Sequence, residues 1–370
     1  MRNVTLSLLL AALPALASAA WNYPVSKTVE HVDDYSGTKI SDPYRWLEEL
    51  DSPDTKAWVA AQNAFTDAAL AKMPERALVK QRLTELWNYP RTGLPTKEAN
   101  WYFYTRNDGL QNQSPLFVQD GLTGAPRLLI DPNTLSADGT VAVTVTSPSP
   151  DGKWLGYGLA RAGSDWNEFH FRDVATGQDA ADVIQWVKFS GMSWTHDAKG
   201  FFYSRFPAPA GGNPKVFTKV ENRQLYYHRM GTPQSEDRLI FALPEHPQWS
   251  FGARVSPDGR YLVISIDQPG QLGNAVSYVD LADEHQPVLG GPVVKLIDSF
   301  TNTHEFLGND GRKFYFFSNE GAPRGRITAL PLDPGGPAAT IVPESADTIE
   351  DVRISARHLV ITYLHDVTNR

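Results

Sequence analysis

The sequence contains no cysteine among its 370 residues. Disulfide bonds, thiolate zinc sites, cysteine-bound iron–sulfur clusters and a cysteine nucleophile are therefore all excluded. A nucleophilic side chain, if the chain has one, must belong to another residue type, such as Ser, Thr, Asp, Glu or Lys.

An excess of positive charge is also missing. Lysine and arginine number 34 against 42 aspartates and glutamates, which gives a net charge of −8. A protein that binds nucleic acid or an anionic membrane normally presents a basic stripe, so the sequence predicts neither among its partners. The 41% hydrophobic and 11% aromatic content excludes global disorder, and the length suits two domains or one large repetitive domain.

Common catalytic and cofactor motifs are absent as well. The chain has no G-x-S-x-G nucleophile elbow, no phosphate-binding or dinucleotide-binding glycine loop, and no H-E-x-x-H zinc helix. His304–Glu305 comes nearest to the zinc motif but lacks the second histidine. Ser164–Asp165 is typical of a turn between strands, with no histidine placed by the sequence to serve it. We predict no catalytic residue, no metal and no cofactor in this chain.

Residues 1–20 have the pattern of a secretory signal peptide. Arg2 precedes the mostly apolar run Val4–Ala17, and Ala17-Ser18-Ala19 offers small residues for cleavage. A membrane anchor is the alternative, but the apolar core is short for a span and ends in alanines. We therefore expect an exported chain that begins near Ala20 or Trp21, either periplasmic or secreted; the lack of cysteine fits a periplasm.

Two helices are expected near the start of the mature chain, after an irregular stretch over residues 21–50. Ser52 is a candidate N-cap with Pro53 in the first helical turn, and Trp58, Ala61 and Phe65 recur at helical spacing, which predicts a helix to about Lys72. A second helix is predicted from Pro74 to about Trp87. Residues 21–92 thus form a short α-helical N-terminal segment, with a domain boundary near residues 89–95.

From residue 93 to residue 370 the hydrophobic period is two, which is typical of strands. Turns built on Asp151, Asp197, Asp258 and Asp310 recur at gaps of 46, 61 and 52 residues. An all-strand repeat of about 40–60 residues indicates a β-propeller, in which Asp and Gly close tight hairpins within a blade. We assign these aspartates to architecture, not to chemistry.

The predicted fold class is therefore all-β. Weaker copies of the repeat stand at Lys97–Tyr104 and Arg353–Leu364, so residues 93–370 supply about five blades and part of a sixth. The last apolar strand, Val360–Leu364, looks like an unfinished hairpin because such a strand normally needs partners on both sides.

Several blocks in this order resemble the prolyl oligopeptidase family, serine peptidases with a seven-bladed propeller over an α/β-hydrolase domain. The blocks are Asp42–Glu48, Thr55–Asn63, Gly109–Gln113, Gly156–Leu159, Gly163–Trp166, Val187–Ser190, Trp194–Asp197, Leu225–His228 and Tyr363–Val367. The resemblance implies that the N-terminal helices pack on the hydrolase domain and that the Ser, Asp and His of the catalytic triad lie beyond Arg370. This chain alone is then predicted to be inactive, either as a fragment of a longer peptidase or as a truncated gene product.

The resemblance also implies one substrate-binding residue. Phe189 matches a propeller phenylalanine that lines a distal apolar subsite for the peptide; ordinary blade core is the alternative. Ser250 stands where the mammalian-type pattern has methionine and Asp267 where it has arginine, so the subsite is expected to be more polar or differently shaped. The stretch Pro207–Asn222 reads either as a loop that gates substrate entry or as a tolerated insertion between strands.

Two functional hypotheses follow. The first is the N-terminal and propeller part of an exported prolyl oligopeptidase that cleaves short peptides after proline, with the propeller restricting access to the active site. Its expected partners are proline-containing oligopeptides and the hydrolase domain. The complete protein is expected to be a monomer. The second is a stand-alone propeller that acts as an exported binding module.

Overall fold

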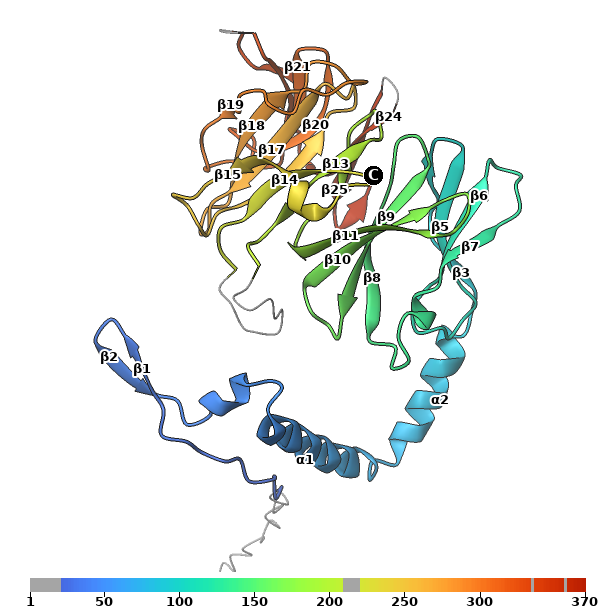
Figure 1. Cartoon of the computed structure of the whole chain (residues 1–370), viewed down its shortest axis with the longest axis vertical. Helices are drawn as coiled ribbons and strands as arrows, with labels where there is room; N and C mark the ends of the chain where they lie inside the picture. Colours follow the sequence, from blue (N-terminus) through green and yellow to red (C-terminus); the bar gives the residue numbers. More distant parts are fainter. Residues whose placement is uncertain (1–20, 209–219, 334–335, 356–357) are drawn as a thin grey trace, which may run out of the picture. The chain divides into compact units, whose positions relative to one another are not determined.

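The computed structural model describes residues 21–208, 220–333, 336–355 and 358–370 (Figure 1). The predicted signal peptide, residues 1–20, and most of the predicted Pro207–Asn222 loop lie outside the described residues. The chain divides into two compact units, one up to Trp87 and one from Asn88 onward.

The first unit contains a hairpin that the sequence did not predict. Strands β1 (Val32–Tyr35) and β2 (Thr38–Ser41) pair antiparallel within the stretch expected to be irregular. Ser36 and Gly37 between them both have positive φ, and the Gly37 amide donates to Asp34 Oδ1 at 2.6 Å. Two positive-φ residues are what a two-residue turn between twisted strands requires, so local turn geometry produces this hairpin.

Helices α1 (Pro53–Leu70) and α2 (Glu75–Trp87) follow the short 3₁₀ helix η1 (Arg45–Glu48). Ser52 is the N-cap of α1, as predicted, and its Oγ accepts a hydrogen bond from the Thr55 amide at 3.1 Å. On α1, the Phe65 ring packs against the rings of Trp21 and Tyr23. No residue of α2 is buried within the described chain.

The second unit consists of six antiparallel sheets in sequence order, each of which is one propeller blade. The first blade holds β3 (Arg91–Thr92), β4 (Thr96–Glu98), β5 (Trp101–Asn107), β6 (Leu116–Asp120) and β7 (Arg127–Ile130). The second holds β8 (Val141–Pro148), β9 (Trp154–Arg161), β10 (Trp166–Asp173) and β11 (Asp179–Lys188). The third holds β12 (Ser193–Trp194), β13 (Gly200–Arg205), β14 (Gln224–Arg229) and β15 (Arg238–Ala242).

The remaining blades continue the pattern. The fourth holds β16 (Ser250–Val255), β17 (Tyr261–Asp267), β18 (Asn274–Asp280) and β19 (Val294–Ile297). The fifth holds β20 (His304–Asp310), β21 (Lys313–Ser318), β22 (Arg326–Pro331) and β23 (Ala339–Val342). The sixth holds only β24 (Thr348–Ser355), β25 (His358–His365) and the short β26 (Thr368–Asn369). The hairpin that the sequence left unfinished therefore gains a third strand, because Thr368 pairs with His365.

The four aspartate turns join the first and second strands of blades two to five, as predicted. Three of them share one local structure, in which a Ser or Thr hydroxyl lies 2.6 Å from the aspartate Oδ1; the pairs are Ser149–Asp151, Thr195–Asp197 and Ser256–Asp258. The fourth turn is tighter, because Asp310 pairs directly with Lys313. Side-chain capping of these turns supplies hydrogen bonds that the chain reversal would otherwise leave unmade.

The core lies between the blades. Five clusters of buried apolar side chains each draw on two consecutive blades, so every blade packs on the next. Phe201 and Phe202 of β13 illustrate the principle: Phe201 packs toward the second blade and Phe202 toward the fourth. Successive residues of a strand point to opposite faces, and both faces are buried here.

Candidate functional site

Phe189 lies in the short connection between β11 and β12, where the chain passes from the second blade to the third. Its side chain is 64% exposed, and its backbone has φ +52°. Phe189 is therefore not part of a blade core, which was one of the two roles predicted for it. A bulky exposed aromatic residue in the left-handed region is unusual and costs free energy.

A cation and an aromatic ring flank Phe189. Lys188 Nζ lies 5.1 Å from the centre of the Phe189 ring and 5.5 Å from the centre of the Trp166 ring. The same ammonium group is 3.5 Å from Asp165 Oδ2. Asp165 follows Ser164, whose Oγ accepts a hydrogen bond from the Trp166 amide at 3.1 Å, so this pair forms a turn as predicted.

Arg223 holds the Phe189 segment from the other side. Its side chain is mostly buried, and Nη1 donates to the carbonyl oxygens of Phe189 at 3.0 Å and Phe251 at 3.1 Å. Its guanidinium carbon lies 5.0 Å from the centre of the Phe206 ring. Desolvation lowers the pKa of Arg223, and the nearby Asp267 charge opposes that shift.

The two positions that depart from the family pattern meet at this place. Ser250 and Asp267 are cross-strand partners on β16 and β17, next to Phe251. Loss of hydration raises the pKa of Asp267, while the Arg223 charge and a hydrogen bond from Ser250 act in the opposite direction. The structure thus brings Phe189, Ser250 and Asp267 around Arg223.

A cavity of about 100 Å³ opens beside Phe189, between the third and fourth blades. It is lined by Phe189, Ser190, Gly191, Phe202, Tyr203, Ser204, Leu225, Gly252 and Ala253. Gly252 and Ala253 leave room in the wall because they carry almost no side chain. Such a space suits a small apolar or weakly polar group next to an aromatic ring.

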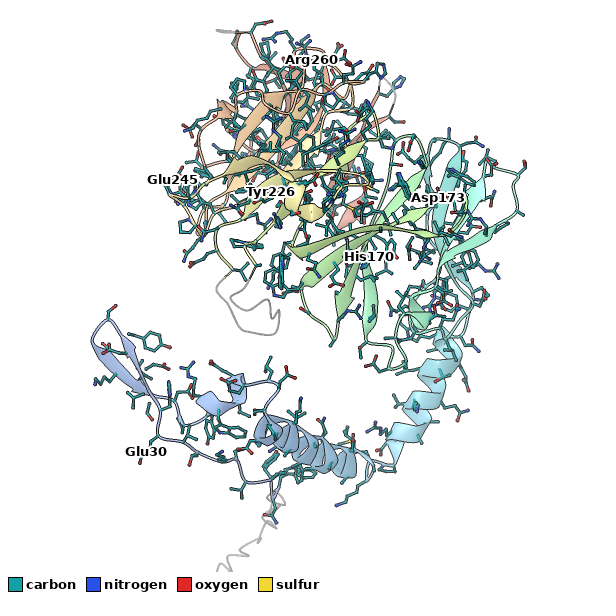
Figure 2. The ribbon with its side chains drawn as sticks, viewed as in Figure 1. Glu30, His170, Asp173, Tyr226, Glu245 and Arg260 are labelled. Carbon is teal, nitrogen blue, oxygen red and sulfur yellow. The ribbon has the colours of Figure 1, made fainter. Side chains whose placement is uncertain are left out.

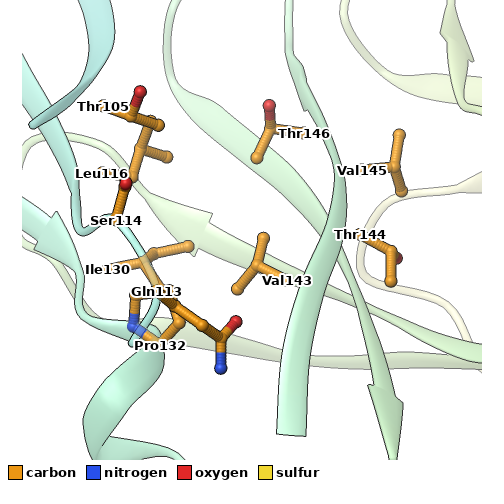
Figure 3. A pocket seen from close by; sticks show the side chains of 10 residues that line it. All are labelled: Thr105, Gln113, Ser114, Leu116, Ile130, Pro132, Val143, Thr144, Val145 and Thr146. Atoms are coloured by element: carbon orange, nitrogen blue, oxygen red, sulfur yellow. The ribbon is translucent and has the colours of Figure 1, made fainter. Parts of the chain in front are cut away.

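A second cavity, of about 240 Å³, lies between the first and second blades (Figure 3). Its wall combines hydroxyl and amide side chains with aliphatic ones: Thr105, Gln113, Ser114, Leu116, Ile130, Pro132, Val143, Thr144, Val145 and Thr146. None of these side chains titrates, so this cavity offers no acid or base.

The third blade buries a cluster of ionisable side chains that the sequence analysis missed. His228 Nδ1 lies 2.7 Å from Asp237 Oδ1, and both side chains are fully buried. Tyr203 donates to the other Asp237 oxygen at 2.5 Å, and desolvation together with the Asp237 charge raises the pKa of that phenol. Among the described residues, no nucleophilic hydroxyl or thiol is paired with the His228 imidazole, whose Nε2 faces Asp182 Oδ1 at 3.6 Å. The cluster therefore resembles a structural network more than a catalytic one.

A second partly buried network lies in the second blade around His170, which Figure 2 labels together with Asp173. His170 stacks on Tyr157, and burial lowers the pKa of its imidazole although Glu168 acts against the shift. Asp173 caps a turn by accepting from the Thr176 amide at 2.8 Å.

His304 lies in β20, mostly buried, with its amide bonded to Asn274 Oδ1. Within the described ranges, no three His, Asp or Glu side chains come together in a way that could hold a metal ion. In that same part of the chain, no helix is both long and apolar enough to cross a membrane.

Comparison with known proteins places these features in a family. Residues 23–370 match the model of the prolyl oligopeptidase N-terminal β-propeller domain. The prolyl endopeptidase of Elizabethkingia meningoseptica is 34% identical over 364 residues, which cover 97% of this chain and 50% of that protein. Prolyl oligopeptidase A of Amanita bisporigera is 32% identical, over 86% of this chain and 46% of that protein.

Solved structures give the same result. Prolyl oligopeptidase B from Galerina marginata, bound to a 25mer macrocyclization substrate, superposes with a TM-score of 0.83 at 26% identity, over 94% of this chain and 52% of that one. A prolyl endopeptidase structure is 37% identical with a TM-score of 0.70, over 94% of this chain and 49% of that one. The chain spans about half the length of the curated relatives that it matches. Its blade repeat, its N-terminal helices and its ordered blocks have one common explanation: the chain belongs to the prolyl oligopeptidase family and corresponds to the N-terminal β-propeller domain.

Proposed function

We propose that this chain is the N-terminal and propeller part of a prolyl oligopeptidase, a serine endopeptidase that cleaves short peptides on the carboxyl side of proline. The observation that carries the proposal is the family match over residues 23–370. In this proposal a serine, a histidine and an aspartate of an α/β-hydrolase domain perform the cleavage, and this chain alone does not hydrolyse peptides.

The propeller restricts access in the proposed enzyme, so that short peptides enter and folded proteins do not. A seven-bladed ring, as in the family, would need a further blade beside the six described. Helix α2 would cover part of the hydrolase domain. The exposure of Leu78 (69%), Leu83 (49%) and Trp87 (56%) supports this role, because helix surfaces with several large apolar side chains usually meet a partner.

Phe189 would contact the peptide at a subsite distant from the cleaved bond. Its exposed ring, the neighbouring cavity of about 100 Å³ and the small residues Gly252 and Ala253 support this assignment. An apolar side chain of the peptide could pack on the ring and place a small group in the cavity.

Export belongs to the proposal as well. The Arg2-led apolar run and the Ala17-Ser18-Ala19 site support removal of the first 20 residues, with the mature enzyme acting in the periplasm or outside the cell. We expect the complete enzyme to work as a monomer.

The test uses the native protein from its source organism. An antibody raised against this propeller should recognise a species roughly twice the 41.0 kDa of this chain, and immunodepletion should remove a proline-specific peptidase activity from the same extract. A native species no larger than this chain, or an activity that depletion leaves untouched, would contradict the proposal.

The cavity of about 240 Å³ favours a second candidate, an exported binding module without catalysis. It has no titratable lining, which suits binding without chemistry. A monodisperse, cooperatively melting monomer of the 370-residue chain would support this candidate over the first, whereas aggregation that a catalytic domain relieves would support the first.

A further inference from the structure

We propose that Arg223 is a positioning residue that holds Phe189 in its exposed orientation and thereby sets how tightly the peptide binds. The inference rests on the proposed contact between Phe189 and the peptide. Arg223 lies outside the sequence blocks that carry the family resemblance.

Phe189 needs an external restraint to keep its exposed orientation. A 64% exposed phenylalanine gains little from burial, and φ +52° is unfavourable for a bulky side chain. Left to itself, such a segment would relax to a more common backbone conformation and turn the ring against the protein surface. A conformation of this kind persists only where neighbouring groups hold it.

Arg223 supplies the restraint on Phe189. Its Nη1 bonds the Phe189 carbonyl at 3.0 Å and the Phe251 carbonyl at 3.1 Å, so one guanidinium ties the connection after the second blade to β16 of the fourth blade. Hydrogen bonds from a charged donor are stronger than neutral ones. The Ser190 hydroxyl, which accepts from the Ser204 amide at 2.9 Å, anchors the next residue in the same way.

The buried charge of Arg223 is compensated by the groups around it. Burying a guanidinium is unfavourable unless charges and hydrogen bonds compensate. Asp267 on β17 supplies the opposite charge and Phe206 a ring face, whereas Lys188, the other charge beside Phe189, pairs with Asp165. Within the described part of the chain, Arg223 Nη1 has two backbone acceptors: the Phe251 carbonyl belongs to β16, and the Phe189 carbonyl belongs to the connection between blades. The arrangement therefore directs a costly buried cation at the backbone of the residue that would meet the peptide.

The experiment compares variants of the native peptidase on a chromogenic amide of a blocked glycyl-proline. Arg223→Met keeps the length of the side chain and its contact with Phe206 but removes every donor. It should raise KM about tenfold and change kcat less than about twofold, because the ring is misplaced while the cleaving groups are untouched. Arg223→Lys restores one donor and should recover most of the loss. Arg229→Met, on the exposed end of β14, is the matched control and should change neither constant.

A double variant separates positioning from general stability. In a Phe189→Ala background the ring is gone, so adding Arg223→Met should change KM by less than about twofold. Additive losses would overturn the inference, and so would an unchanged KM in Arg223→Met when Phe189→Ala does raise KM. If Phe189→Ala itself leaves KM unchanged, the proposed peptide contact fails instead.

Hydrogen exchange of the complete peptidase, followed at the amides of this propeller, tests the positioning with a measurement that does not depend on peptidase activity. Arg223→Met should speed exchange of the amides over residues 189–191 about tenfold or more and leave the strands of the second and fourth blades unchanged. Unchanged exchange at residues 189–191 would overturn the inference whatever the kinetics show. Faster exchange throughout the unit would identify Arg223 as a general stabiliser and would overturn it as well.

Discussion

The ionisable side chains of His228 and Asp237 are fully buried in the third blade. Such a pair is costly to desolvate, and it persists because Tyr203 also donates to Asp237 and Gln234 donates to Tyr203. The network connects β13, β14 and the 3₁₀ helix η4 (Gln234–Glu236), so its members depend on one another.

Replacing Asp237 should therefore destabilise the folded protein strongly. Asp237→Ala leaves the imidazole of His228 and the phenol of Tyr203 buried without their acceptor, and we expect the free energy of unfolding to fall by about 3 kcal/mol. Tyr203→Phe removes the bond that the phenol donates to Asp237 and the one that it accepts from Gln234, and it should cost less, about 1–2 kcal/mol. Urea unfolding followed by fluorescence measures both, and equal losses would contradict the network interpretation.

Ala198 occupies the position that Gly152 and Gly259 hold in the equivalent turns. All three residues have positive φ, at 55°, 71° and 74°. Ala198→Gly relieves the strain and should raise the free energy of unfolding by about 0.5–1 kcal/mol. Gly152→Ala is the opposite test, since its Cβ would lie 2.8 Å from Trp101 Cδ1, and it should destabilise the protein. Thermal unfolding checks both, and a lower melting temperature for Ala198→Gly would refute the strain argument.

Strands β10 and β11 are linked by a cross-strand ion pair as well as by their backbone ladder. Arg172 and Asp179 face each other, with Nε to Oδ1 at 2.7 Å, and Arg172 Nη1 also donates to the Leu129 carbonyl of the first blade at 2.6 Å. Desolvation acts to raise the pKa of Asp179, but the hydrogen bonds and charge of Arg172 outweigh it and hold the pKa below its ordinary 3.8.

This pair predicts an acid dependence of stability. A carboxyl group with a lowered pKa in the folded state stabilises the fold above its unfolded pKa, and the contribution disappears as the pH falls through the folded value. Asp179→Asn should cost about 1 kcal/mol or less at pH 7, because the carboxylate is partly exposed. The difference from the parent protein should shrink as the pH falls below 3.8 and vanish once Asp179 is protonated in the folded state. A difference that persists at low pH in unfolding curves would exclude the charge as the cause.

Across the second unit, each blade completes the core of its neighbours, so the interfaces between blades hold the unit together. Stability of such an array is approximately a sum of nearest-neighbour terms. A cavity at one interface should therefore weaken two blades at once.

Phe202→Ala tests this arrangement, since Phe202 is 1% exposed in the cluster shared by the third and fourth blades. We expect a loss of about 3–5 kcal/mol from the missing contacts and the cavity. Leu272→Ala, at a 96% exposed position, is the control and should change stability by less than about 0.5 kcal/mol. Calorimetry measures the change, and a small effect of Phe202→Ala would mean that the blades are stable separately.

Local patterns were sufficient for much of the fold. Ser52 was recognisable as an N-cap because capping depends on residues next to each other, and the Asp-based turns were recognisable for the same reason. The hairpin over Val32–Ser41 escaped because it has only four residues in each strand and one Ser-Gly turn, too short to show a clear period.

The candidate site was predictable in only one of its parts. Phe189 could be named from the resemblance, but its exposure and positive φ could not, because they depend on what packs around residues 186–191. Nothing in the local sequence marks Arg223, because many charged residues precede an apolar strand. The Phe189 and Phe251 carbonyls to which it donates lie 34 and 28 positions away in the chain.

Short-range order in the chain was thus enough for the all-β repeat, its turns and the helices, since hydrophobic period, capping and turn residues act over a few positions. The family was named from the resemblance of ordered sequence blocks, and the family match confirms it. Which residues converge on Phe189, and the burial of His228 with Asp237, came only from the folded chain. The physical reason is that blades bury both faces against neighbours about 50 residues away, and burial and charge pairing at that separation leave no local pattern.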